Sequence, residues 1–150
     1  MHLPSLIPGL LLALVPLIDA ARSSKADSAI LLSKVRTLTL YGDKQTTHRR
    51  VSAIPQLACV GGNGCKHHEV DLMRCTNAGS EYDAEDVQWT CSASLPSEFK
   101  LGSTEVICEG YDNADDPWVL KGSCAVEYRL VNPLTIFQNC NANSSQSTAH

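Results

Sequence analysis

Residues 123–130 read SCAVEYRL, and this stretch indicates the fold class because apolar and polar side chains alternate along it. A period of two is typical of a β-strand with one buried face. The predicted inner face holds Cys124, Val126, Tyr128 and Leu130, and the opposite face holds Ala125, Glu127 and Arg129. A cysteine in phase with apolar residues points into the core, where a disulfide can tie two layers together.

Working outward, most of the chain resembles this stretch. Residues 35–41 alternate, are rich in β-branched side chains and end at the turn signal Gly42-Asp43. We expect residues 46–51 to return as the second strand of a hairpin. Further short strands are expected at residues 70–75, 86–92 and 105–109, whereas only residues 28–35 hint at a helical period. The predicted fold class is all-β, a disulfide-stapled β-sandwich-like domain.

Length and charge narrow the class of protein. A chain of 150 residues favours one domain, and a net charge of −4 without a basic run argues against nucleic acid as a partner. Seven cysteines in so short a chain suggest disulfides and an oxidising compartment, or else a metal site.

The cysteines divide into a domain set and one in the tail. Cys140 lies in the tail, where it could pair with another chain, pair with a segment missing here, or stay free. Six residues make up the domain set: Cys59, Cys65, Cys75, Cys91, Cys108 and Cys124. Six cysteines allow 15 pairings, which the sequence cannot sort. We predict three disulfides, each stabilising the domain by roughly 2–4 kcal/mol through restriction of the unfolded chain.

Metal binding is the alternative use of these residues. Cys59, Cys65, His67 and His68 could form a zinc site, but adjacent histidines on a strand point to opposite faces and no C-x-x-C pair is present. The acidic turns at residues 83–86 and 112–116 lack the spacing of an EF-hand loop, so we interpret them as solvated turns. We predict no metal site and no cofactor.

Two further motifs invite a chemical interpretation. The glycine-rich run at residues 60–64 is not followed by Lys-Ser or Lys-Thr, so a tight turn that uses φ > 0 explains it better than a phosphate loop. Arg49 and Arg50 could bind an anion, but we favour a charged strand edge that blocks aggregation. No G-x-S-x-G or H-E-x-x-H motif is present, and we predict that the protein is not an enzyme.

The first residues predict the compartment. Residues 6–18 are almost wholly apolar, a run too short for a bilayer crossing of roughly 20 residues but suited to a secretory signal peptide. We predict a signal peptide over residues 1–20; a buried helix is the weaker alternative because prolines interrupt the run. Residues 131–150 are expected to form a polar, disordered tail with a glycosylation sequon at Asn143.

Several blocks resemble one family. They read TTHRR at residues 46–50, IPQLACVGG at 54–62, DVQWTC at 86–91, CEGY at 108–111 and VLKGSCAVEY at 119–128. Together they resemble, in order, the lumenal domain of the store-operated calcium entry-associated regulatory factor (SARAF) family, which would occupy residues 34–130 here. All six domain cysteines fall within the resemblance.

The resemblance implies a role as well as a fold. Members of the family are single-pass membrane proteins of the endoplasmic reticulum that act as negative regulators of store-operated calcium entry. Their partner is the calcium sensor of that compartment, the stromal interaction molecule, and the lumenal domain is regarded as sensing or restraining through self-association. We therefore expect a homodimer in the endoplasmic reticulum membrane or lumen, or a secreted binding module without a calcium-entry role if the chain ends at His150.

Overall fold

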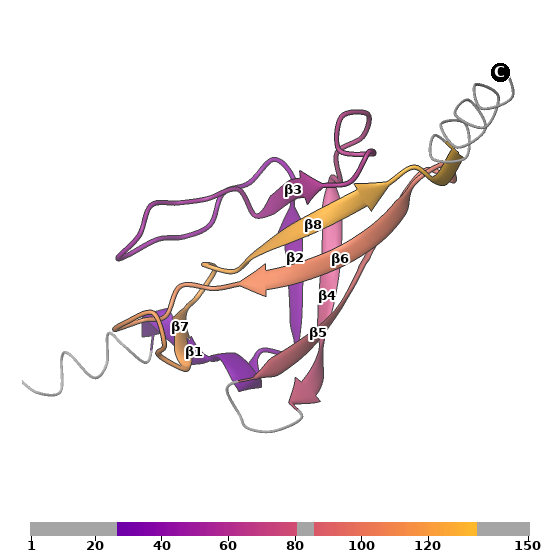
Figure 1. Ribbon diagram of the computed structural model, residues 1–150. Helices are drawn as coiled ribbons and strands as arrows, with labels where there is room; N and C mark the ends of the chain where they lie inside the picture. Colours follow the sequence, from indigo (N-terminus) through magenta and orange to yellow (C-terminus); the bar gives the residue numbers. More distant parts are fainter. Residues whose placement is uncertain (1–26, 81–85, 135–150) are drawn as a thin grey trace, which may run out of the picture.

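The computed structural model describes residues 27–80 and 86–134. Its elements are β1 (Ala29–Leu31), the 3-10 turn η1 (Leu32–Lys34), β2 (Thr37–Tyr41), β3 (Leu57–Gly61), β4 (Leu72–Ser80), β5 (Val87–Ala93), β6 (Lys100–Ile107), β7 (Trp118–Leu120) and β8 (Ala125–Val131) (Figure 1). No helix in these ranges is long and apolar enough to cross a membrane. The predicted signal peptide, Cys140, Asn143, the tail from residue 135 on, and residues 83–85 of the first acidic turn lie outside the described residues.

Two three-stranded sheets form the body of the domain. One has the order β2-β4-β5 and is antiparallel; the other has the order β3-β8-β6, with β3 parallel and β6 antiparallel to β8. Their strands cross in Figure 1, and a small β1-β7 sheet lies near one end. The all-β, disulfide-stapled fold predicted from the sequence is therefore confirmed.

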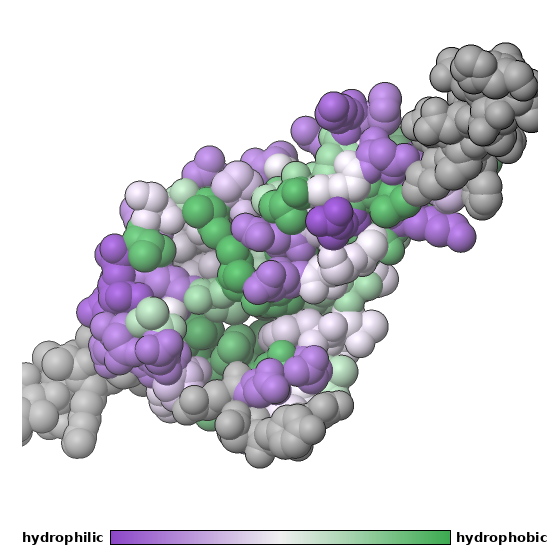
Figure 2. All heavy atoms as spheres, in the orientation of Figure 1, coloured by the Kyte–Doolittle hydropathy of each residue, from purple (hydrophilic) through white to green (hydrophobic). Residues whose placement is uncertain are grey.

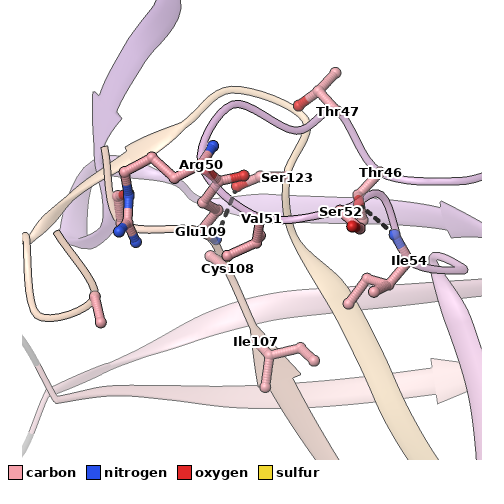
Figure 3. Close-up of a pocket in the computed structure, with 12 residues that line it drawn as sticks. Thr46, Thr47, Arg50, Val51, Ser52, Ile54, Ile107, Cys108, Glu109 and Ser123 are labelled. Carbon is pink, nitrogen blue, oxygen red and sulfur yellow. Dashed lines mark hydrogen bonds between the residues drawn. The ribbon is translucent and has the colours of Figure 1, made fainter. Parts of the chain in front are cut away.

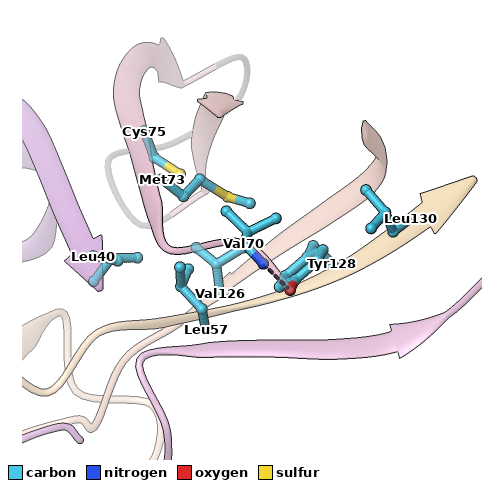
Figure 4. Packing of buried hydrophobic residues seen from close by; sticks show 8 residues of the cluster. All are labelled: Leu40, Leu57, Val70, Met73, Cys75, Val126, Tyr128 and Leu130. Carbon is cyan, nitrogen blue, oxygen red and sulfur yellow. Dashed lines mark hydrogen bonds between the residues drawn. The ribbon is translucent and has the colours of Figure 1, made fainter. Parts of the chain in front are cut away.

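The core lies between the two large sheets. Its buried members are Leu40, Leu57, Val70, Met73, Cys75, Val126, Tyr128 and Leu130 (Figure 4). The predicted inner face of β8 is buried, and the hydroxyl of Tyr128 accepts a 3.1 Å hydrogen bond from the backbone N–H of Val70. That bond satisfies the polar end of an otherwise apolar side chain. Ala125, on the opposite face of β8, is buried as well.

Two local predictions were wrong. Residues 46–51 form no strand. They belong to a loop, and the only β-bridge between the two segments that flank it joins Gln45 and Pro55. Residues 29–34 form β1 and η1 rather than a longer helix, because β1 pairs with β7. Long-range contacts override a weak local preference in both places.

Gln56 joins the two large sheets at a corner. Its backbone carbonyl accepts a hydrogen bond from the N–H of Val126 in β8, and its N–H donates to the carbonyl of Lys44. Its side-chain carbonyl accepts a 3.0 Å bond from the N–H of Tyr41 in β2, while its side-chain amide donates to Gln45. One residue thus fastens the end of β2 to the start of β3 and to β8.

Three disulfides staple the structure, pairing Cys59 with Cys65, Cys75 with Cys91 and Cys108 with Cys124. The second joins directly opposed residues of β4 and β5, and the third follows the Ile107–Ala125 pair of β6 and β8. The two bridges of equal spacing therefore close two antiparallel strand pairs. Because Cys59 and Cys65 bond to each other, neither can supply a thiolate to zinc.

The glycine-rich run packs against the end of β8. Gly62 has φ +91°, as the predicted turn requires, and a Cβ on it would lie 2.0 Å from the carbonyl oxygen of Leu130. Next to it, the Asn63 side chain donates to the Asn132 carbonyl at 2.9 Å and accepts from the Asn132 N–H at 2.8 Å. The glycine-rich run at residues 60–64 is therefore a structural clamp: it packs against the end of β8 and holds it in place.

Candidate interaction site beneath the 46–54 loop

A loop of residues 46–54 leaves the body of the domain between β2 and β3. Its two ends meet at Thr46 and Ile54, where the N–H of each residue donates to an oxygen of the other, at 2.8 and 3.1 Å. Thr47 fastens the loop to the turn before β8: its N–H donates to Gly122 and its hydroxyl to Lys121. The base of the loop is therefore held by backbone and threonine-hydroxyl hydrogen bonds rather than by a strand ladder.

The Glu109 side chain fastens the tip of the loop. One carboxylate oxygen accepts the N–H of Arg50 at 2.5 Å, and the other accepts the N–H of Arg49 at 3.1 Å. In return, the Arg50 side chain donates to the Gly110 carbonyl and the Arg49 side chain to the Tyr111 carbonyl. The loop and residues 109–111 thus bind each other reciprocally through charge-assisted hydrogen bonds.

The arginine side chains do not form the strand edge predicted from the sequence, so that interpretation was wrong. The guanidinium of Arg49 lies 4.2 Å from the ring centroid of Tyr111 and 3.8 Å from a carboxylate oxygen of Asp112. It is the backbone amides of Arg49 and Arg50, rather than the arginine side chains, that hold an anion, and that anion is the internal carboxylate of Glu109.

The position of Glu109 follows from the neighbouring disulfide. Cys108 and Cys124 are bonded, and the residues beside them are joined as well, because the N–H of Glu109 donates to the Ser123 hydroxyl oxygen at 3.0 Å. Both side chains are buried. Burial alone raises the pKa of the Glu109 carboxyl, but the amides of Arg50, Arg49 and Val51, with the Arg50 charge, outweigh it and lower that pKa. Glu109 is therefore an ionised anchor.

A cavity of about 420 Å³ lies beneath the loop. Val51 and Ile54 line it from the loop, and Ile107 lines it from the end of β6 (Figure 3). The side chains of Val51 and Ile54 remain 54% and 38% exposed. Figure 2 shows hydrophobic surface gathered over this part of the molecule. A mostly apolar hollow of this size suits an apolar ligand or side chain.

The chemistry of the site favours binding. The amide donors that occupy the Glu109 carboxylate leave it poorly placed to act as a base. In the second acidic turn, the Asp116 carboxylate accepts the N–H groups of Asp112 and Trp118, and the Asn113 side chain accepts that of Asp115. Among the described residues, no group of three His, Cys, Asp or Glu side chains could hold a metal ion.

Sequence reasoning missed the central residues of this site. Glu109, Ser123 and Thr46 come together only in three dimensions, from segments that are far apart in the chain. The sequence offered one indirect signal for them. Glu109 and Ser123 are neighbours of Cys108 and Cys124, which are 16 residues apart, as Cys75 and Cys91 are.

The fold and the site define a disulfide-stapled β domain with a mostly apolar hollow beneath a fastened loop. A family model described as SOCE-associated regulatory factor of calcium homoeostasis matches residues 9–149. The chain belongs to this family of store-operated calcium entry-associated regulatory factors.

Relatives of that name confirm the resemblance found in the sequence. The rat protein is 45% identical over 122 residues, which are 81% of this chain and 36% of the relative. The human protein is 47% identical over 102 residues (67% and 30%), and the zebrafish protein 46% over 105 residues (69% and 30%). The chain thus spans about a third of the length of these relatives.

Proposed function

We propose that this protein takes part in the regulation of store-operated calcium entry and that it acts as a negative regulator. Membership of the family carries the proposal, since a model matching residues 9–149 bears the name of a calcium regulatory factor. The curated relatives are named store-operated calcium entry-associated regulatory factors, and the negative direction of the regulation is what the family resemblance implies. The fold supports a binding role rather than an enzymatic one, because the hollow beneath the 46–54 loop is mostly apolar and the buried Glu109 carboxylate is engaged by backbone amides.

The proposed compartment is the endoplasmic reticulum, with this domain in the lumen. Three disulfides support that proposal because such bonds persist in oxidising compartments and are rare in the cytosol. The apolar run at residues 6–18 supports it as a candidate signal peptide. Secretion as a binding module is the second candidate, and the exposed hollow beneath the 46–54 loop is compatible with it.

The proposed partner is the calcium sensor of the endoplasmic reticulum, with a second copy of this chain as a further partner. Edge strands support self-association, because β2 and β5 border one sheet and β3 and β6 border the other. Light scattering of the oxidised protein tests the dimer, and a monomer at high concentration would count against it.

The test of function uses the longest natural transcript that encodes this chain. Cells of the source organism that lack the gene are depleted of stored calcium, and cytosolic calcium is followed after calcium is returned. The proposal predicts larger sustained entry without the gene and a return to normal entry on re-expression. Re-expression of a Cys75→Ser/Cys91→Ser variant, which lacks one staple of the core, is expected not to restore it. Unchanged entry in the deleted cells would contradict the role.

Glycan analysis separates the two proposed compartments. Retention in the endoplasmic reticulum predicts a cell-associated protein whose glycan at Asn143 stays sensitive to endoglycosidase H. Recovery of the protein from the medium would instead support the secreted binding module.

A further inference from the structure

Two like charges face each other on the outer surface of the β3-β8-β6 sheet. Glu105 of β6 and Glu127 of β8 are directly opposed in the register of the two strands. Glu105 is exposed and Glu127 is half-buried. No hydrogen bond or ion pair joins either carboxylate to the described part of the chain. Like charges directly opposite each other destabilise a sheet. This pair therefore lowers the stability of the fold, and no contact among the described residues offsets the loss.

The surroundings leave the pair open. On the far side of β8, Glu127 is opposed by Ala58 of β3, whose side chain is too short to cover it. The nearest cation along β8 is Arg129, but its guanidinium lies over β3, 2.8 Å from where a Cβ of Gly61 would stand. A basic group from another molecule can therefore reach both carboxylates.

The same face leads to the hollow beneath the 46–54 loop. Ile107, which lines that hollow, is two residues beyond Glu105 and is opposed by Ala125, two residues before Glu127. Residues two apart on a strand share a face and lie about 7 Å from each other. An apolar hollow and an unneutralised negative pair thus lie side by side on one face of the sheet.

We propose that this face binds an extended segment of a partner protein that presents an aliphatic and a basic side chain two residues apart. The aliphatic side chain enters the hollow against Ile107, and the basic side chain lies between Glu105 and Glu127. An extended segment has the same two-residue spacing of about 7 Å as the strand that it meets. The inference goes beyond the calcium-entry role and does not rest on it.

Short peptides test the proposal on the purified, oxidised protein. The probes are acetyl-Thr-Leu-Thr-Lys-Thr-amide and its reversed sequence, and the matched controls carry Glu in place of Lys. Titration is followed by the backbone amide signals of Val51, Ile54 and Ile107 in ¹⁵N-labelled protein. In low salt at least one lysine peptide is expected to bind about tenfold more tightly than its glutamate control. Added salt is expected to reduce the difference.

Substitutions assign the effect to the pair. In a Glu105→Gln/Glu127→Gln variant, the preference for lysine is expected to fall below about threefold, because the attracting charges are gone. A Glu69→Gln/Glu98→Gln variant makes the same change in net charge at exposed glutamates outside the pair and is expected to keep the preference. Equal binding of lysine and glutamate peptides, or no saturable shift with any peptide, would overturn the proposal.

The stability of the unliganded protein gives an independent check. Removal of the repulsion predicts a higher urea midpoint for the Glu105→Gln/Glu127→Gln variant than for the native protein. The Glu69→Gln/Glu98→Gln variant is expected to keep the native midpoint. If the Glu105→Gln/Glu127→Gln variant were no more stable than the native protein, the two carboxylates would not repel each other in the fold, and the inference would be overturned.

Discussion

Replacement of Glu109 by alanine removes the anchor of the 46–54 loop. The carboxylate accepts the N–H groups of Arg49 and Arg50, at 3.1 and 2.5 Å. A hydrogen bond to a charged group contributes about 1.5–3 kcal/mol. Because both arginines are exposed, water can replace part of the loss, and the lower figure applies. We expect Glu109→Ala to lower the free energy of unfolding by about 3 kcal/mol, and Glu109→Gln, which keeps one acceptor oxygen, by about half as much.

Urea unfolding followed by tryptophan fluorescence measures the loss. Glu98→Ala is the matched control, because Glu98 is an exposed glutamate away from the loop; it is expected to change stability by less than about 0.5 kcal/mol. A Glu109→Ala variant that unfolds within that margin of the native protein would refute the role of the carboxylate as an anchor.

The stability that Glu109 contributes is expected to decrease as the pH falls. The pKa of its carboxyl is lower in the folded protein than its ordinary value of 4.5, because amide hydrogen bonds outweigh the opposing effect of burial. The stability that the carboxylate contributes is therefore complete well above pH 4.5 and is lost as the pH falls through the lowered pKa. The difference in stability between native protein and Glu109→Ala should be constant near neutral pH and shrink below about pH 4.5. A difference that grows on acidification would contradict this.

Three further predictions concern Gln56, the glycine-rich run and the disulfides, and each is tested by urea unfolding. Gln56→Leu loses the two side-chain hydrogen bonds that join Gln56 to Tyr41 at the end of β2 and to Gln45, and it is expected to destabilise the fold by about 2 kcal/mol. Gly62→Ala, which would place a Cβ 2.0 Å from a backbone oxygen, should cost more than Gly79→Ala, where φ is +99° but no atom lies within 4 Å; equal costs would disprove the clamp. Removal of the Cys59–Cys65 disulfide, whose cysteines are 6 residues apart, should lower stability by about 0.8 kcal/mol less than removal of the Cys75–Cys91 disulfide, whose cysteines are 16 apart. A larger loss from the shorter disulfide than from the longer one would contradict chain entropy as the cause.

Local patterns predicted the strands that alternate clearly. Residues 123–130 and 86–92 correspond closely to β8 and β5, because one face of each strand packs toward the core and the other toward solvent. The run at 46–51 misled because its β-branched and charged residues suit an edge strand equally well. What decides its conformation is the Glu109 carboxylate, about 60 residues away in the chain, and no local pattern contains that contact.

Long-range pairing also explains the other gaps. Six cysteines allow many pairings, and only the strand register shows why Cys75 meets Cys91. The three-residue strands β1 and β7 are too short to show a period and exist because they pair with each other. The opposed glutamates of β6 and β8 could be recognised only once the register was known.

The most direct test of this account is non-reducing peptide mapping of the protein isolated from cells with its thiols blocked at lysis. We expect three disulfides: one within a single peptide, joining Cys59 to Cys65, and two that join Cys75 to Cys91 and Cys108 to Cys124. Blocked free thiols at these positions, or a different set of links, would contradict both the stapled fold and the oxidising compartment proposed for it.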